Sequence, residues 1–315
     1  MSPFLNGSST SSTHRAPAEG PVVLQTVRTL FGRAAPDLMP LAATPRQPPR
    51  PELPPPEPTL WPAGRLAVAE ALWGEGYLFP GGEAETLRLA RPLGLSAAAS
   101  LLVVGAGSGG PPRSIASHLG SWVSGFEYDP ALVSLAAARC AGAGLGRRAG
   151  VARWDPDEPA FRARHYHHGL ALEPLRVARP EAALAAIAGA LKPSGQLLLV
   201  EAVADTPLEP DDPVVAAWLR LDGRTHPPPT EMAVTRMLGR LGLDVRLAED
   251  ISSRHAGQAL QGWRAAVAIL RDHPPDARRA AALVTEAELW LLRLRLIRAG
   301  KLRLVRWIAL GRGGT

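Results

Sequence analysis

The sequence predicts an α/β protein built on a doubly wound, mostly parallel sheet of seven strands, a Rossmann-like architecture. From about residue 61 onward, apolar strand-like runs alternate with helical patterns, which is typical of a parallel sheet covered on both faces. The stretch Leu101–Pro130 begins with such a run, passes through a glycine-rich turn and a helix, and ends a second run with an acid. With 315 residues, 46% of them hydrophobic, the chain can form one large core with appendages.

Apolar and β-branched runs of five to seven residues locate six strands. The expected strands are Ser100–Val104, Trp122–Phe126, Gly150–Trp154, His168–Leu172, Gln196–Ala202 and Leu243–Ala248. Helical spacing of apolar residues locates the helices between and after them. The expected helices are Arg65–Trp73, Gly82–Leu93, Arg113–Leu119, Ala131–Ala143, Pro180–Leu191, Glu231–Leu241, Ala256–Arg271 and Asp276–Arg298. Leu302–Leu310 fits either a helix or a closing seventh strand. The KPSG sequence after Leu191 predicts a turn, and residues 205–229 predict a Pro/Asp-rich excursion.

Composition divides the chain into three parts. Residues 1–60 are rich in Ser, Thr and Gly and then in Pro, which predicts a disordered, proline-rich N-terminal segment. Residues 61–250 hold the alternating pattern and form the main domain. Residues 251–315 are predicted to be a C-terminal helical extension packed on that domain.

The charge balance and the single cysteine limit which partners and which cellular compartment are expected. The net charge is +6 and the pI is near 10.3, but arginine is used along the whole chain, so we expect no nucleic-acid partner. Cys140 is the one cysteine, which excludes an intrachain disulfide and predicts a buried apolar position. No run of eighteen apolar residues and no signal segment is found, so we expect a cytoplasmic protein without a membrane span. The sequence does not set the oligomeric state.

The glycine turn and the acid that follows it predict a binding site for an adenosine-containing cofactor. Glycines let the backbone turn tightly and approach a ligand closely, and the next helix directs free N–H groups to the same place. Glu127 follows about twenty residues later, where a carboxylate can accept hydrogen bonds from both ribose hydroxyls. Gly105 and Gly107 with Gly110 satisfy the nicotinamide fingerprint G-x-G-x-x-G, and with Gly109 they equally satisfy G-x-G-x-G.

Three motifs resemble the S-adenosylmethionine-dependent methyltransferases of the seven-stranded class I superfamily. They are GFEYDP at the end of the second strand, LKPSGQLLLVEAV at the fifth, and WGEGYLFPGG before the first. The last of these, with the helix after it, is similar to the entrance of small-molecule methyltransferases such as the phosphoethanolamine N-methyltransferases. The resemblance covers about Trp61–Asp250. It implies the methyltransferase form of the fold, S-adenosylmethionine as cofactor and a small-molecule acceptor.

The resemblance also implies roles for individual residues. Those expected to pass beneath the methionine and ribose of the cofactor are Gly105, Ala106, Gly107 and Gly109. Glu127 would bind the ribose hydroxyls and Tyr128 would lie along the adenine. Asp155 stands where the family places an acid near the adenine amino group, and Tyr77 would lie over the methyl-donor end. No metal site is expected.

The sequence departs from the family at three places. The segment before the fourth strand reads ARHYHHGL, where the family often has Phe-Asp. Val103 stands where the family usually has an acid that helps to hold the amino group of the cofactor. The segment LEPLRVA after the fourth strand lacks the catalytic histidine of the phosphoethanolamine enzymes. The catalytic residue is therefore unknown, and the candidates near the expected active face are His165, His168 and Glu173.

The sequence also predicts roles for four further residues. Glu201 either contacts the ligand or supports the sheet edge. Trp218 is predicted to pack in the core, and Arg220 and Arg224 to be surface charges.

Three functions follow from these observations. The first is a small-molecule methyltransferase that uses S-adenosylmethionine. The second is a catalytically weak or inactive protein of the same fold that acts as a binding or scaffold protein, suggested by Val103. The third is an NAD-dependent oxidoreductase, for which the sequence offers no hydride-transfer residue.

Overall fold

The computed structural model describes residues 59–312. Its helices and strands alternate as the sequence predicts. In chain order they are α2 (Ala63–Trp73), α3 (Gly82–Ala90), β1 (Ser100–Val104), α4 (Gly110–Leu119), β2 (Trp122–Glu127), α5 (Pro130–Gly142), β3 (Ala149–Arg153), β4 (Tyr166–Leu172), α6 (Pro180–Ala190), β5 (Leu191–Ala204), α7 (Pro213–Asp222), α8 (Glu231–Arg240), β6 (Leu243–Asp250), α9 (Ser252–Asp272), α10 (Ala277–Arg298) and β7 (Leu302–Gly311). Short 3-10 turns lie at Arg91–Leu93 and Pro174–Arg176.

The seven strands form one sheet in the order β3-β2-β1-β4-β5-β7-β6, which confirms the predicted fold class. The pairs from β3 to β5 are parallel, whereas β7 runs antiparallel to both β5 and β6. Dinucleotide-binding doubly wound sheets have the order 3-2-1-4-5-6. The insertion of an antiparallel seventh strand beside β5 distinguishes this sheet from them.

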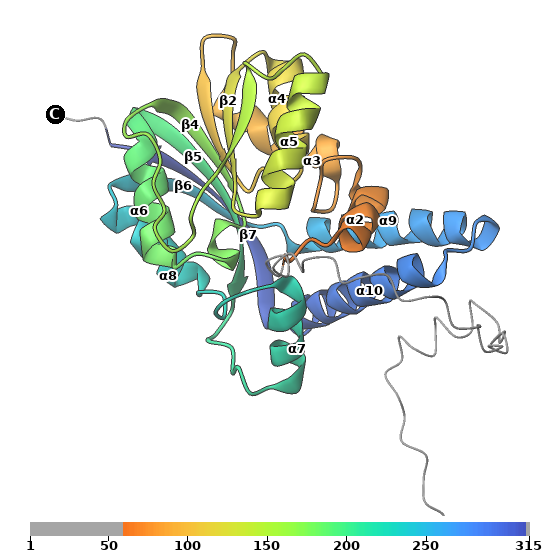
Figure 1. The fold of residues 1–315 in the computed structure, drawn as a ribbon. Helices are drawn as coiled ribbons and strands as arrows, with labels where there is room; N and C mark the ends of the chain where they lie inside the picture. The colour runs from red at the N-terminus through yellow and green to blue at the C-terminus, as the bar shows by residue number, and fades with distance from the viewer. Residues whose placement is uncertain (1–58, 313–315) are drawn as a thin grey trace, which may run out of the picture. The chain divides into compact units, whose positions relative to one another are not determined.

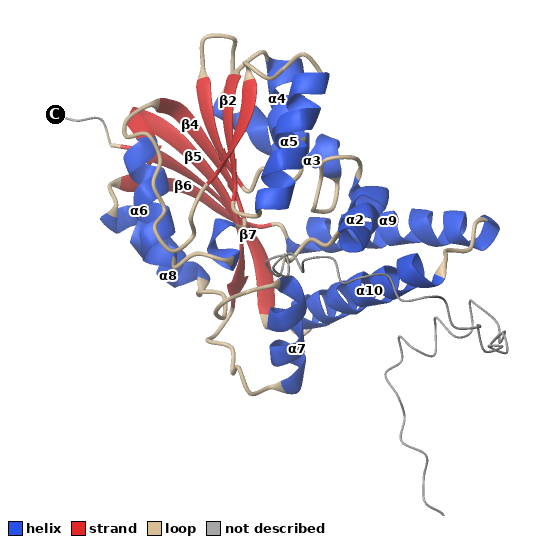
Figure 2. Cartoon of the chain, in the orientation of Figure 1, coloured by secondary structure: helices blue, strands red, loops and turns tan. Residues whose placement is uncertain are grey.

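Helices cover both faces of the sheet (Figures 1 and 2). Alternate residues of β1 face opposite ways: Leu101 and Val103 join a core beneath α4 and α5, whereas Leu102 and Val104 join a core beneath α6 and α8. All four side chains are buried, as expected for a strand in the middle of a parallel sheet.

A second group of helices closes the edge of the sheet where the parallel strands end. Figure 1 shows α2, α9 and α10 side by side, with α7 next to α10. Trp73 of α2 packs edge-on against Trp290 of α10, with ring centroids 5.1 Å apart. Helices from both ends of the described chain therefore meet over the carboxyl ends of the strands, where α/β proteins bind ligands.

Several expected boundaries were wrong. The fourth strand begins at Tyr166 instead of His168, and β5 extends back to Leu191. The predicted KPSG turn lies inside β5 as an irregularity in its pairing with β4, with Ser194 at φ 59°. The Pro/Asp-rich excursion contains α7, whose first turn is capped by Asp212.

The described residues also bear on the domain division. The segment Leu302–Gly311 is a strand between β5 and β6, so the part expected to be a helical extension completes the sheet. The predicted disordered segment at residues 1–60 lies almost entirely outside the described residues. Cys140 is buried, as expected. Between residues 59 and 312, no helix is long and apolar enough to cross a bilayer.

The central role of β7 in the core can be tested at Trp307. This side chain is fully buried, and its Nε1 donates to Thr235 Oγ1 at 3.0 Å. We expect Trp307→Ala to lower the free energy of unfolding by about 3 to 5 kcal/mol in urea denaturation, because it leaves a cavity. Trp122→Ala, at a side chain 48% exposed, is the control and should cost less than about 1 kcal/mol. Equal losses would contradict the assignment of β7 to the core.

Candidate active site

The glycine turn after β1 is held tightly against the neighbouring strands. Gly105 has φ 83°, and a Cβ placed there would lie 2.4 Å from the carbonyl oxygen of Leu172, at the end of β4. The amides of Gly105 and Ala106 both donate to the carbonyl oxygen of Phe126 in β2, at 3.0 and 3.1 Å. Only glycine fits at position 105. Because no side chain intervenes, the turn packs between the ends of β2 and β4.

The carboxylate of Glu127 reaches from the end of β2 into this turn. Its Oε2 accepts from the amide of Gly107 at 2.8 Å, and its Oε1 accepts from the amide of Tyr128 at 2.9 Å. The residue is 4% exposed and lines the cavity beside the turn. Burial raises the pKa of Glu127, although both backbone hydrogen bonds oppose the rise. Each carboxylate oxygen keeps a lone pair that a ligand can use.

The segment Gly74–Gly82 lies over the same turn and is fixed by Glu70 of α2. The amide of Gly110 donates to the carbonyl oxygen of Gly76 at 3.0 Å. Glu70 Oε1 accepts from the amide of Gly76 at 3.1 Å and from Ser108 Oγ at 2.6 Å, and Arg139 of α5 forms an ion pair with the same carboxylate. Burial favours a higher pKa for Glu70, but the hydrogen bonds from Arg139 and Ser108 outweigh it and the pKa is lowered. The covering segment is thus tied to α2, α4 and α5.

A cavity extends from the glycine turn to α9 and α10. A smaller hollow beyond Glu127 adjoins it and shares five of its lining residues: Gly105, Glu127, Leu172, Glu173 and Arg176. The other residues that line this hollow are aromatic or apolar: Tyr128, Trp154, Pro174 and Val177.

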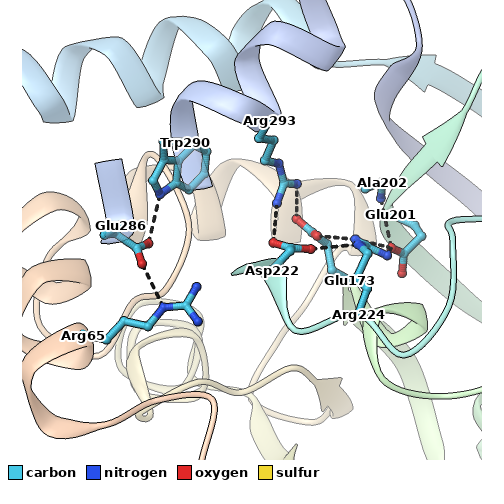
Figure 3. Close-up of polar contacts among 9 residues, drawn as sticks. All are labelled: Arg65, Glu173, Glu201, Ala202, Asp222, Arg224, Glu286, Trp290 and Arg293. Carbon is cyan, nitrogen blue, oxygen red and sulfur yellow. Dashed lines mark hydrogen bonds and ion pairs between the residues drawn. The ribbon is translucent and has the colours of Figure 1, made fainter. Parts of the chain in front are cut away.

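A buried network of ion pairs forms one wall of the cavity (Figure 3). Arg224 is fully buried and pairs with Glu173 at 2.9 Å, Asp222 at 2.8 Å and Glu201 at 3.3 Å. Arg293 of α10 pairs with Glu173 at 2.5 Å and with Asp222 at 3.6 Å. Burial raises the pKa of Glu201 and opposes the ionisation of Glu173, but Arg293 and Arg224 hold the pKa of Glu173 far below its ordinary value. The network joins the ends of β4 and β5 to α7 and α10.

The predicted cofactor residues fall into two groups. Gly105, Gly107 and Glu127 line the large cavity, and Tyr128 lines the smaller hollow with its hydroxyl buried and without a partner. Gly109 packs against α5, where a Cβ would lie 3.1 Å from the Cα of Ala136.

Three further predicted cofactor residues do not line either space. Ala106 is buried in the turn. Tyr77 is directed at α4 instead of the cavity: a Cβ on Gly110 would lie 2.9 Å from its ring. Burial raises the pKa of its hydroxyl to about 12. Asp155 is exposed and accepts from the amide of Asp157 at 2.9 Å, so it stabilises a local turn.

The expectation that His165 and His168 lie near the active face was wrong. Because β4 begins at Tyr166, both histidines lie at its amino end, and His168 pairs in register with Leu101 at the start of β1. In a parallel sheet, that edge is opposite the one that carries Gly105 and Glu127. The histidine between them, His167, is held by the amide of Ser100, which donates to its Nδ1 at 3.0 Å.

The other residues singled out from the sequence differ in whether they line the cavity, support the surrounding structure or lie at the surface. Glu173 lines the cavity, although both of its oxygens are engaged by arginines. Glu201 is fully buried and accepts from the amides of Leu175 and Ala202, which is the supporting role. Trp218 is buried in the core as predicted and Arg220 is exposed, whereas Arg224 is fully buried and was wrongly expected at the surface.

The sequence analysis missed several cavity residues, His255 and Arg176 among them. His255, in the second turn of α9, lines the cavity and is 5% exposed. Arg176 lines both spaces, and its Nε is buried without a partner. One signal was present in the sequence: each residue follows closely on a strand that ends at the ligand-binding edge, Arg176 after β4 and His255 after β6.

Solved structures that superpose on this chain include several methyltransferases and a cyclase. Phosphoethanolamine N-methyltransferase 2 from Haemonchus contortus, solved with phosphomonomethylethanolamine and S-adenosylhomocysteine, superposes with a TM-score of 0.70 at 17% identity, over 80% of this chain and 59% of that chain. A sarcosine dimethylglycine methyltransferase homologue from Galdieria sulphuraria gives 0.62 at 16% identity, over 72% and 85% of the two chains. The [4+2]-cyclase SpnF gives 0.60 at 19% identity, over 81% and 93%.

These similarities establish that the chain has the fold of the class I, seven-stranded methyltransferases. The chain spans about three fifths of the length of the Haemonchus enzyme. No protein-family model matches the sequence. No curated protein matches it either.

The fit of the glycine turn can be tested with a matched pair of substitutions. Gly94 and Gly105 both have positive φ, but a Cβ on Gly94 meets nothing within 4 Å. Gly94→Ala should cost about 1 to 2 kcal/mol of unfolding free energy, from its backbone conformation alone. Gly105→Ala should cost at least about 1 kcal/mol more, because the Leu172 carbonyl must move. Equal costs in urea denaturation would show that the turn has room for a side chain.

The stability of the protein at acidic pH should depend on Glu85, which lines the cavity. Burial opposes its ionisation, yet hydrogen bonds from Arg88 and Arg254 lower its pKa from the ordinary 4.5 to about 2. The unfolded chain therefore binds more protons, so this contribution is present above pH 4.5 and is lost as the pH falls toward 2. The unfolding free energy of Glu85→Gln should lie below that of the native protein above pH 4.5, and the two should converge below it. A difference independent of pH would contradict this assignment.

Proposed function

We propose that the chain is an S-adenosylmethionine-dependent methyltransferase that acts on a small-molecule acceptor. The observation that carries the proposal is the buried carboxylate of Glu127, which lines the cavity and is bonded to the Gly107 amide across the glycine turn. The fold is that of the class I methyltransferases, and solved neighbours were captured with S-adenosylmethionine or S-adenosylhomocysteine.

The residues around the turn fit such a cofactor. A side chain at position 105 would collide with the Leu172 carbonyl, so the turn leaves bare backbone beside the cavity. The hollow beyond Glu127 is lined by the aromatic rings of Tyr128 and Trp154, which suit an adenine. Its lining residues carry three buried polar atoms without partners, the Tyr128 hydroxyl, Trp154 Nε1 and Arg176 Nε. We assign the ribose hydroxyls to Glu127 and the adenine to the space between Tyr128 and Trp154.

The cofactor, when bound, would supply a methyl group activated by a sulfonium. The protein then has to hold the acceptor in line with the methyl group and exclude water. The segment Gly74–Gly82 provides the cover, fixed through Glu70, and α9 and α10 provide the far wall. The cavity-lining Glu173 is held by two arginines with its pKa far below the ordinary value, so it is a poor proton donor or acceptor and positions the wall instead.

The same fold also supports another chemistry, because SpnF, a [4+2]-cyclase, superposes on most of this chain. Val103 is fully buried within β1 and does not line the cavity. A protein that binds the nucleoside without transferring a methyl group is therefore the second candidate. Incubation with S-adenosylmethionine labelled in its methyl group, in a metabolite extract, separates the two: the methyltransferase transfers label to a small molecule, and the binding protein does not.

Cofactor binding is tested by calorimetry with S-adenosylhomocysteine. The native protein should bind it and should not bind NADH. Glu127→Ala should weaken binding about 10- to 100-fold, because a charge-assisted hydrogen bond contributes about 1.5 to 3 kcal/mol. Glu209→Ala, at an exposed acid before α7, is the control and should leave the dissociation constant unchanged. An unchanged constant in Glu127→Ala would remove Glu127 from the site, and failure of the native protein to bind would overturn the proposed function.

A further inference from the structure

The part of the cavity farthest from the glycine turn forms a chamber between α2, α3, α9 and α10, which we call the acceptor chamber. Much of its wall is apolar, from side chains that belong to four separate segments of the chain. They are Phe79, Leu89, Ile251, Leu289 and Trp290. Such a wall favours the apolar body of a ligand.

Charged side chains also line the chamber, and those of α2, α3 and α10 are each matched by an opposite charge. Arg176, for which the described residues show no ion pair, lies beside Glu127 where the cavity meets the smaller hollow. Arg65 donates to Glu286 at 2.8 Å, and Glu286 also accepts from Trp290 Nε1 at 3.1 Å (Figure 3). At the back, Arg293 is engaged by Glu173 and Asp222.

The acid at the mouth of the chamber, Glu85, is held by Arg88 and Arg254. A charged ligand entering the chamber would therefore lose its hydration without gaining a free counter-charge, which is costly.

His255 is an uncharged polar group in this wall. Its ring lies 5.5 Å from that of Trp290, and its Nε2 is buried with no hydrogen-bond partner. Burial and the nearby Arg293 lower its pKa to about 3, so the imidazole is neutral at physiological pH. In a neutral imidazole, Nε2 is either an N–H donor or a lone-pair acceptor, depending on the tautomer, and a hydroxyl group can pair with either form.

We propose that the acceptor chamber takes an uncharged, mainly apolar molecule whose hydroxyl group pairs with His255. The inference rests on the proposed methyltransferase function, because the chamber is the acceptor's place only if the cofactor occupies the glycine turn. It differs from what the Haemonchus neighbour was solved with, the charged phosphomonomethylethanolamine. The paired arginines of this chain offer such a headgroup no free counter-charge.

The test compares three probes with the same flexible eight-carbon chain and different head charges: 1-octanol, octanoate and octylammonium. Calorimetry is performed on the full chain saturated with S-adenosylhomocysteine. We expect octanol to bind at least about tenfold more tightly than either charged analogue. A charged analogue that binds as tightly as octanol, or an absence of octanol binding, would overturn the inference. Binding of S-adenosylhomocysteine in the first step tests the proposed function separately.

Substitutions then test the reason for the preference. Glu286→Gln leaves Arg65 without its carboxylate, so the affinity for octanoate should rise about tenfold while the affinity for octanol is unchanged. Should this variant not fold, Arg65→Met makes the opposite change and should favour octylammonium. If neither variant binds its charged probe more tightly than the native protein does, ion pairing is not what excludes charged ligands from the chamber.

The role of His255 is tested by His255→Phe. This variant should weaken octanol binding at least about fivefold and leave S-adenosylhomocysteine binding unchanged. Octanol binding at the native affinity would remove His255 from the proposal. Asp244→Asn, which breaks the exposed ion pair with Arg246 on β6, is the control and should alter none of the four affinities.

Discussion

The hydrogen bond between the Glu127 carboxylate and the Gly107 amide is the contact on which the site depends. It requires two neighbouring parallel strands, β1 and β2, that end at the same level, and a turn after β1 that carries no side chain at position 105. It also requires a carboxylate that is removed from water, which raises its pKa and makes its remaining lone pairs available to a ligand. The covering segment, the cavity and the adjoining hollow are all arranged around this contact. A ligand that bridges the turn and the carboxylate would stabilise the contact further.

The far side of the cavity is stabilised in a different way. The glycine turn is local in sequence, whereas the acceptor chamber joins α2 with α9 and α10, about 180 residues later in the chain. The Arg65–Glu286 ion pair joins α2 to α10, and the network of Arg224 and Arg293 around Glu173 and Asp222 joins α10 to α7 and the end of β4 (Figure 3). Buried ion pairs contribute little net stability, but loss of one partner is expensive, so they fix which groups face each other. The same pairing that holds the helices together leaves the chamber without a free charge.

Much of the fold and the cofactor side of the site could be predicted, because both are encoded locally. The run from Leu101 to Glu127 fixes two strands, a turn and an acid within thirty residues, and the predicted roles of Gly105, Gly107 and Glu127 remain compatible with the cavity. The histidines at 165 and 168 were misplaced although the expected strand already began at His168, because the start of a parallel strand lies at the edge opposite the ligand-binding one. Arg224 was wrongly expected at the surface and His255 was missed, since their burial depends on segments that are distant in sequence. The seventh strand was ambiguous for the same reason: its neighbours in the sheet, β5 and β6, lie far upstream.

The decisive experiment is a crystal structure of the protein with S-adenosylhomocysteine. We expect both ribose hydroxyls to lie within hydrogen-bond distance of the Glu127 carboxylate, the adenine to lie between Tyr128 and Trp154, and the sulfur to point toward the acceptor chamber. A nucleoside bound elsewhere, or one bound at the glycine turn without contact to Glu127, would contradict it.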